Sequence, residues 1–166
     1  MKIISGIIGT GIGEKHFEAI ENCKNSETKI LCEKNRRKLK ILKKKYPKKI
    51  LTDNENKIFK DKNINVVSIA SYDGDHYKQI IKSIKFKKNI IVEKPMCLKP
   101  NQLKNIYNLL KKNKVKMISN LVLRVNSLFL NLKKKINKNK IYYIEADYIW
   151  GREKKLYGWR SKEKDY

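Results

Sequence analysis

The chain has 166 residues, and 40% of them are hydrophobic. This length suits one well-packed domain and the beginning of another, and this apolar content argues against wholesale disorder. The formal net charge of +25 is typical of proteins that bind nucleic acid or anionic membranes. Nearly all of the positive charge is lysine, however, and it is spread along the whole chain together with many Asn and Ile residues. We therefore attribute the basicity to composition and keep a basic nucleic-acid-binding protein only as a third alternative.

The cysteines and the apolar runs indicate a cytoplasmic location and no metal site. Cys23, Cys32 and Cys97 form no C-x-x-C pair, so the sequence predicts neither a disulfide framework nor a zinc site. Residues 1–9 are interrupted by glycine, which favours a buried strand over a signal peptide. No apolar run approaches the roughly 20 residues of a membrane span. We expect a cytoplasmic protein that does not bind membranes.

Short apolar runs rich in β-branched residues alternate with segments of helical periodicity. The expected strands cover residues 3–8, 29–32, 66–70, 89–92 and 116–119. The expected helices carry apolar stripes at Phe17, Ile20 and Cys23; at Leu39, Leu42 and Tyr46; at Tyr77, Ile80, Ile81 and Ile84; and at Leu103, Ile106, Tyr107 and Leu110. This alternation predicts an α/β fold, a doubly wound parallel sheet with helices on both faces.

The pattern changes near residue 120. Residues 124–137 indicate one more helix, and residues 141–150 alternate between apolar and other side chains with a period of two. Such alternation is typical of a half-exposed, usually antiparallel strand. We therefore expect a first domain over residues 1–120 and the incomplete beginning of an α+β second domain over 121–166.

The first expected strand leads directly into a glycine turn and then into a helix. The turn reads Gly9-Thr10-Gly11-Ile12-Gly13. In a dinucleotide-binding Rossmann fold, the first glycine permits the tight turn, the second lets the pyrophosphate approach the backbone, and the helix N-terminus offers free N–H groups. Gly9 and Gly11 fit the first two roles, and we predict that the whole turn binds the cofactor.

A carboxylate follows the second expected strand. Glu33 lies about twenty residues beyond the glycines, where an acidic residue accepts hydrogen bonds from the adenine ribose hydroxyls. Its charge would repel a 2′-phosphate, so the sequence favours NAD as the cofactor. Arg36, Arg37 and Lys38 follow closely and would neutralise that phosphate, so NADP stays possible.

Two further segments follow expected strands and narrow the fold to a family. They read I-A-S-Y-D-G-D-H at 69–76 and V-E-K-P at 92–95. With the glycine turn and His16 in the helix after it, they resemble the glucose-fructose oxidoreductase, inositol dehydrogenase and MocA (Gfo/Idh/MocA) family, in the same order along the chain. The resemblance extends through L-R-V-N at 123–126 to G-W-R at 158–160.

The resemblance implies roles for the residues of both loops. Ser71, Tyr72 and His76 would line the cofactor side of the crevice, and Glu93 would lie near the nicotinamide. Lys94 would hold the substrate hydroxyl or its proton relay, which makes it the expected catalytic residue. Both loops follow strands, and ligands of open parallel sheets bind outside the carboxyl ends of the strands.

His16 and Pro95 are expected to shape the site. The resemblance implies that Pro95 fixes its loop, often through a cis peptide bond, and that His16 supports a neighbour instead of catalysing. The interval from Gly9 to His16 is one residue shorter than is usual in the family. The sequence therefore leaves open which glycine takes the third role, the close packing of helix against strand.

The resemblance also implies an activity, that of an NAD(P)-dependent oxidoreductase acting on a sugar, sugar-nucleotide or cyclitol hydroxyl. Full-length relatives carry an Asp and a His for proton transfer beyond the position of residues 158–160, and this sequence ends at Tyr166. We therefore expect no turnover by the chain alone, and the alternative function is a non-catalytic dinucleotide-binding module. The expected partners are the dinucleotide, a carbohydrate-like substrate in full-length relatives, and a second copy paired through the second-domain sheet.

Overall fold

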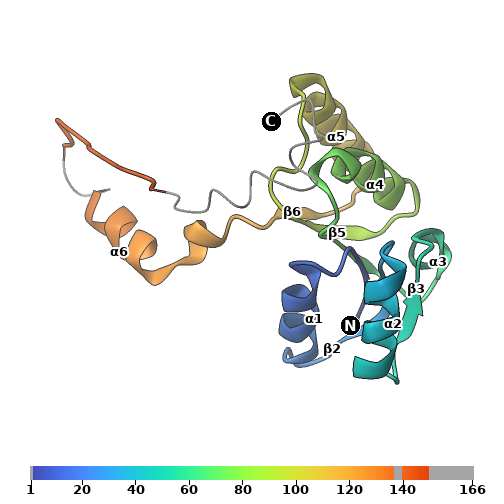
Figure 1. Cartoon of the computed structure of the whole chain (residues 1–166). Coiled ribbons are helices and arrows are strands. Elements are labelled where there is room, and N and C mark those ends of the chain that lie inside the picture. The colour runs from blue at the N-terminus through green and yellow to red at the C-terminus, as the bar shows by residue number, and fades with distance from the viewer. Residues whose placement is uncertain (1, 137–139, 150–166) are drawn as a thin grey trace. The chain divides into compact units, whose positions relative to one another are not determined.

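The computed structural model describes residues 2–136 and 140–149 of the chain. The chain divides into two compact units, Met1–Asn120 and Leu121–Tyr166. The first unit holds a β-sheet wrapped by helices (Figure 1). All the candidate site residues fall in this unit.

The sheet of the first unit has six parallel strands in the order β3-β2-β1-β4-β5-β6. The strands are β1 (Ile3–Ile8), β2 (Ser26–Cys32), β3 (Ile50–Thr52), β4 (Val66–Ile69), β5 (Asn89–Val92) and β6 (Met117–Ser119). The chain moves outward from β1 to β3, crosses back to β4 beside β1, and continues outward to β6. The strand order therefore reverses between β1 and β4, and such a switch point is where open α/β sheets bind ligands.

Helices cover both faces of this sheet. They are α1 (Gly13–Glu21), α2 (Arg36–Lys45), α3 (Asn56–Lys60), α4 (Asp73–Lys85) and α5 (Pro100–Asn113). In Figure 1, α1 and α2 lie on one side of the strands, and α4 and α5 lie on the other. The predicted doubly wound Rossmann sheet is therefore confirmed.

Successive residues of the central strand β1 face different helical layers. Ile7 is fully buried against Phe17 of α1 and Leu31 of β2. Its neighbour Ile8 belongs to a larger core cluster that contains Ile84 of α4 and Ile106 of α5. Side chains of a strand alternate between the two faces of its sheet. A strand covered on both faces must therefore be apolar at consecutive positions.

Local signals mark where two helices begin. The Asn35 side chain accepts a hydrogen bond from the Lys38 backbone N–H at 3.1 Å and caps α2. Pro100 begins α5, where its fixed φ suits a helix and its missing N–H would have had no intrahelical acceptor. Both helices thus start in loops that follow a strand.

The expected strands of the first unit all form, and the structure adds two short elements that the sequence pattern does not indicate. The strand β3 has three residues and the helix α3 has five, too few for a periodic pattern to stand out. The expected first helix includes Cys23, but α1 ends at Glu21. The Cys23 N–H donates to Ile20 O at 3.2 Å, three residues back, and this tightened turn ends the helix and leaves Cys23 exposed.

The second unit contains a short 3-10 helix, η1 (Val122–Val125), and the helix α6 (Ser127–Ile136). The sequence predicts one helix over 124–137, and the structure interrupts it at Asn126. The Asn126 backbone is extended, with φ −68° and ψ 132°, and its side chain accepts a hydrogen bond from the Leu128 N–H at 2.9 Å. An Asn side chain that binds a nearby N–H in this way favours a helix start over a helix interior.

The expected strand over 141–150 does not form within the described residues. Residues 140–149 have no regular secondary structure, and residue 150 lies outside the described part. Tyr142 and Ile149 are 91% and 92% exposed, so the alternating pattern covers no core here. A strand needs hydrogen bonds to a neighbouring strand, and no strand among the described residues pairs with this segment. The prediction is wrong because alternation supplies a face but no partner.

Candidate functional site

The glycine turn follows β1 at the switch point of the sheet. Gly9 has a φ of +83°, a conformation that residues with a Cβ rarely adopt. A Cβ on Gly9 would also lie 2.7 Å from the Ala70 carbonyl carbon and from the Ser71 Cα. Only glycine therefore fits here, and the turn after β1 packs closely against the end of β4.

Gly11 and Gly13 take different roles in the same turn. No atom lies within 4 Å of a Cβ built on Gly11, so its backbone faces open space. Gly13 is buried, and a Cβ there would lie 3.0 Å from Ile7 Cγ2 and 3.3 Å from Ala70 Cβ. Gly13 is therefore the glycine that lets helix and sheet approach, which answers the question left open by the shortened spacing.

The glycine turn offers both open space and free backbone N–H donors. The first N–H groups of a helix have no intrahelical acceptor, and the helix N-terminus carries partial positive charge. In α1 these groups begin at Gly13, directly after Ile12, which is 51% exposed, and after the open backbone of Gly11. The arrangement fits the pyrophosphate of a dinucleotide.

Glu33 joins the end of β2 to the glycine turn. Its Oε2 accepts hydrogen bonds from the Thr10 N–H at 3.2 Å and from the Thr10 hydroxyl. Its Oε1 accepts a hydrogen bond from the Asn35 N–H at 2.8 Å. The carboxylate therefore lies beside the turn and is held from two sides, at the position where an adenine ribose is expected.

The cations that follow Glu33 have different surroundings. The Lys38 ammonium donates to Thr10 O at 2.5 Å and lies 3.8 Å from a Glu14 carboxylate oxygen. Arg36 and Arg37 are exposed in the first turn of α2. Lys38 is therefore already engaged with the glycine turn, whereas both arginines remain exposed to solvent.

The loop after β4 presents a mixture of exposed and buried groups. The Ser71 hydroxyl donates to Gln79 Oε1 at 2.6 Å, and Tyr72 is 50% exposed. His76 is 0% exposed, with Nδ1 at 2.7 Å from Pro95 O and Nε2 at 3.2 Å from Ser71 O. Because its ring is buried and both nitrogens face protein carbonyls, the His76 side chain does not line the crevice as the sequence suggests. It instead connects the loop after β4 to the loop after β5.

Four polar side chains meet at the carboxyl ends of β4, β5 and β6. His16 of α1 places Nε2 at 2.9 Å from Glu93 Oε1 and Nδ1 at 2.7 Å from Ser68 Oγ. The Asn120 amide donates to the same Glu93 oxygen at 2.5 Å. The side chains of His16 and Glu93 are only 10% and 12% exposed. The glycine-turn helix and the loop after β5 are thereby tied together.

The surroundings of Glu93 stabilise its charged form. Burial by itself raises the pKa of this carboxyl group, but the hydrogen bonds from His16 and Asn120 lower it. The balance leaves the pKa of Glu93 below its ordinary value. Glu93 is therefore an anion that the fold holds in a fixed position.

Lys94 follows this anchored carboxylate and is exposed. The peptide bond between Lys94 and Pro95 is cis. Asn120 and Ser68 complete the polar cluster, and neither is among the site residues predicted from the sequence. Asn120 directly follows β6, as Glu93 follows β5, so the rule that site residues follow strand ends would have indicated it.

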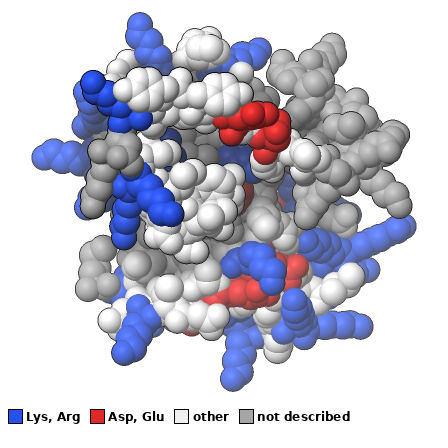
Figure 2. Space-filling view, turned by 90° about the vertical axis from the view of Figure 1, so that its left-hand side faces the viewer, with Lys and Arg blue, Asp and Glu red and all other residues white. Residues whose placement is uncertain are grey.

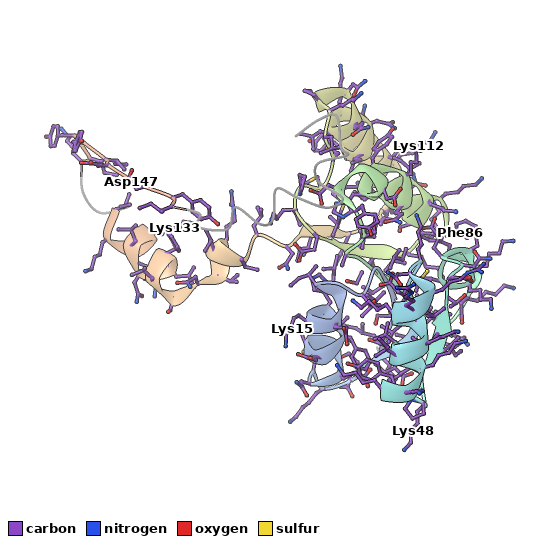
Figure 3. All side chains as sticks on the ribbon, viewed as in Figure 1. Lys15, Lys48, Phe86, Lys112, Lys133 and Asp147 are labelled. Atoms are coloured by element: carbon purple, nitrogen blue, oxygen red, sulfur yellow. The ribbon has the colours of Figure 1, made fainter. Side chains whose placement is uncertain are left out.

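Many basic side chains lie away from this site. Lys15 on α1, Lys48 after α2 and Lys112 on α5 project from separate parts of the first unit, and Lys133 projects from α6 of the second (Figure 3). On the face drawn in Figure 2, Lys and Arg side chains are spread around the surface instead of forming one stripe. This scatter agrees with the compositional interpretation of the charge.

The described residues contain no group of three or more His, Cys, Asp or Glu side chains that could hold a metal ion. Among their helices, none has both the length and the apolarity needed to cross a membrane.

Comparison with protein families assigns the chain to one of them. The sequence model of an oxidoreductase family with an NAD-binding Rossmann fold matches residues 3–121. The chain belongs to this family, Gfo/Idh/MocA. The resemblance inferred from the glycine turn and the two strand-end loops is thereby confirmed, as is NAD as the cofactor of this Rossmann fold.

Solved structures share the fold of the chain. A probable dehydrogenase from Thermotoga maritima is 22% identical, with a TM-score of 0.76 over 82% of this chain and 41% of that one. The scyllo-inositol dehydrogenase from Lactobacillus casei with NAD(H) and scyllo-inositol is 19% identical, with a TM-score of 0.76 over 83% and 42%. The WlbA dehydrogenase from Bordetella pertussis with NADH and UDP-GlcNAcA is 21% identical, with the same TM-score and coverage. At these identities the likeness shows the fold alone.

The chain is shorter than the solved structures that share its fold. The chain spans about two-fifths of the length of these solved structures. No curated protein sequence matches the chain significantly.

Proposed function

We propose that residues 1–120 are the dinucleotide-binding domain of an NAD-dependent oxidoreductase that acts on a sugar, sugar-nucleotide or cyclitol hydroxyl, and that residues 121–166 begin its substrate domain. The observation that carries the proposal is the arrangement along the carboxyl edge of the sheet. The open turn at Gly11 follows β1, Glu33 follows β2, and Lys94 follows β5. A dinucleotide bound across the switch point passes all three positions.

The pyrophosphate binds at the glycine turn. Gly11 and Ile12 offer backbone beside open space, and the N-terminus of α1 supplies N–H donors and partial positive charge. Gly9 and Gly13 shape the turn through the positive φ and the close helix packing described above. Thr10 supports the turn from inside, because Glu33 accepts hydrogen bonds from its N–H and hydroxyl and Lys38 donates to its carbonyl.

The adenine ribose binds at Glu33, and this end of the site favours NAD over NADP. The carboxylate accepts hydrogen bonds from the ribose hydroxyls and repels a 2′-phosphate. Lys38 is engaged with Thr10 O and supports the turn. The exposed Arg36 and Arg37 therefore determine how strongly NADP binds.

The nicotinamide end lies toward the loops after β4 and β5. Ser71, Tyr72 and Glu93 flank it, and NAD when bound supplies the hydride acceptor. Lys94 is the catalytic residue in this half, because its ammonium donates a hydrogen bond to the substrate hydroxyl and holds it in place. The buried His76 is not among the direct contacts.

Ligands of related solved structures and the position of Lys94 support the substrate class. Two solved structures of the same fold are complexes with scyllo-inositol and with UDP-GlcNAcA, a cyclitol and a sugar nucleotide. Both ligands present hydroxyl groups of the kind that Lys94 would bind. The family and the exposed position of Lys94 support the same class.

Calorimetric titration of the full chain with NAD tests the proposal. We expect saturable binding at one site. A Lys94→Met variant should still bind NAD, because the adenosine and pyrophosphate contacts lie elsewhere, and it should lose any NADH formation that the unaltered chain shows with polyols. The absence of NAD binding at millimolar concentration would contradict the proposal.

A further inference from the structure

The sequence contains two histidines, and both contact a residue adjacent to Lys94. His16 contacts Glu93, and His76 contacts Pro95. We propose that His16 and His76 are positioning residues that clamp the chain on either side of Lys94. The inference rests on the proposed role of Lys94 for its functional meaning, but the clamp can be tested without any ligand.

The contact on the side of Glu93 assigns the proton of His16. A carboxylate only accepts hydrogen bonds, so the Nε2–H of His16 donates to Glu93 Oε1 across 2.9 Å. The other ring nitrogen, Nδ1, then accepts from the Ser68 hydroxyl at 2.7 Å. Asn120 donates to the same carboxylate oxygen. This tautomer satisfies Glu93 and Ser68, and the Asn120 amide, which lies 3.4 Å from His16 Nε2, gives its hydrogen bond to Glu93 instead.

The contact on the side of Pro95 requires the opposite tautomer. Both carbonyls that face His76 only accept hydrogen bonds. The shorter distance, 2.7 Å from Nδ1 to Pro95 O, assigns the N–H to Nδ1, whereas Nε2 lies 3.2 Å from Ser71 O. His76 is 0% exposed, so water does not compete for this bond.

The two anchors come from opposite layers of the fold. The helix α1, which carries His16, packs on the face of the sheet where Ile7 lies. The helix α4, which carries His76, packs on the opposite face, where Ile8 lies. The segment 93–95 is therefore held from both layers while the Lys94 side chain stays exposed. Fixing the backbone in this way reduces the freedom that Lys94 would lose when it meets a substrate.

Atom-matched amide substitutions separate positioning from general packing. The side-chain nitrogen of Gln matches the position of His Nε2, and that of Asn matches His Nδ1. His16→Gln and His76→Asn therefore keep the donor that each clamp contact needs. His16→Asn and His76→Gln are matched controls that remove a similar volume but misplace the donor.

The readout is the mobility of the Lys94 backbone N–H in the full chain, measured by ¹⁵N relaxation. We expect an order parameter of about 0.85 for the unaltered chain, His16→Gln and His76→Asn, and below about 0.6 for His16→Asn and His76→Gln. Urea unfolding of each variant separates this effect from a loss of stability. A Lys94 order parameter that is the same in all folded variants would overturn the proposal.

Two further measurements test the protonation sites of the histidines and the effect of NAD on Lys94. Long-range ¹H–¹⁵N spectra of the unaltered chain should show His16 protonated at Nε2 and His76 at Nδ1. A proton on Nε2 alone of His76 would overturn the clamp even if the misplaced-donor variants fail to fold. Addition of NAD should shift the Lys94 amide signal, and the absence of this shift with an intact order-parameter pattern would contradict the proposed function and leave the clamp standing.

Discussion

Thr10 and Glu33 are joined across the carboxyl edge of the sheet, although they lie 23 residues apart in the sequence. Glu33 Oε2 accepts hydrogen bonds from both the N–H and the hydroxyl of Thr10. One carboxylate thus shapes the glycine turn and faces the expected ribose site. Pyrophosphate binding and cofactor preference therefore depend on the same side chain.

Replacing Glu33 with Ala should weaken NAD binding by about 10- to 100-fold, because hydrogen bonds to a charged group contribute about 1.5–3 kcal/mol. NADP binding should fall less, since the repulsion of its 2′-phosphate is removed, and the preference for NAD should narrow. Calorimetric titration with both dinucleotides measures the ratio. Glu27→Ala is the control, because Glu27 lies on β2, the strand that Glu33 follows, and pairs only with Lys2 among the described residues. Tighter NADP than NAD binding by the unaltered chain would mean that Arg36 and Arg37 decide the preference.

Replacing Gly11 with Val should prevent dinucleotide binding and leave the fold intact. The branched side chain would fill the open space that the pyrophosphate needs. The free energy of unfolding should change by no more than about 0.5 kcal/mol, because no protein atom lies within 4 Å of a Cβ at this position. Gly9→Ala is the contrasting variant, and it should be destabilised by at least about 1–2 kcal/mol because of its positive φ. Urea unfolding and titration with NAD distinguish the two, and an equal loss of stability in both variants would refute this division of roles.

Glu93 should make the stability of the chain depend on pH in the acidic range. Its pKa in the folded chain lies below the ordinary value of 4.5, so folding favours the charged form. Its contribution is therefore fully present above pH 4.5 and is lost as the pH falls through the lowered pKa. Urea unfolding of the unaltered chain and of Glu93→Gln at a series of pH values should show a stability difference that shrinks below pH 4.5. A difference that grows with acidification would have the wrong sign.

The positive charge should produce only weak, sequence-independent binding to DNA. Lys and Arg side chains are scattered over the face drawn in Figure 2, and counterion release makes such binding depend strongly on salt. Affinity for a duplex should be mostly lost between about 50 and 200 mM salt. Fluorescence anisotropy with two unrelated duplexes measures both properties. Tight and sequence-selective binding at physiological salt would instead favour a nucleic-acid function.

Residues close together in the sequence determined much of the fold and part of the site. Consecutive apolar residues such as Ile7 and Ile8 predicted strands covered on both faces, and the glycine turn with Glu33 predicted a dinucleotide site. These signals are local, because they depend on the period of a strand and on the conformations open to glycine. The order of strands and helices along the chain then leaves few arrangements of the sheet.

The local sequence pattern predicted secondary structure less well where a strand needs a neighbouring strand. The alternating residues 141–149 form no strand in the described structure, because a strand depends on a neighbour that the pattern does not supply. The strand β3 forms without a strong pattern, since β2 supplies that neighbour. The structure was also needed to show which glycine lets helix and sheet pack closely, because the short distance from a Cβ built on Gly13 to Ile7 Cγ2 identifies it.

The sequence by itself determined the family and the parallel sheet, and it indicated Glu33, Glu93 and Lys94 at the carboxyl edge but not Ser68 or Asn120. Only the tertiary structure decided how those residues are paired. His16 and Glu93 are 77 residues apart, and His76 meets the carbonyl of Pro95 from the opposite layer. Such contacts depend on the register of the strands and on where each helix crosses the sheet. Those positions result from packing of the whole core, so no local pattern in the sequence specifies them.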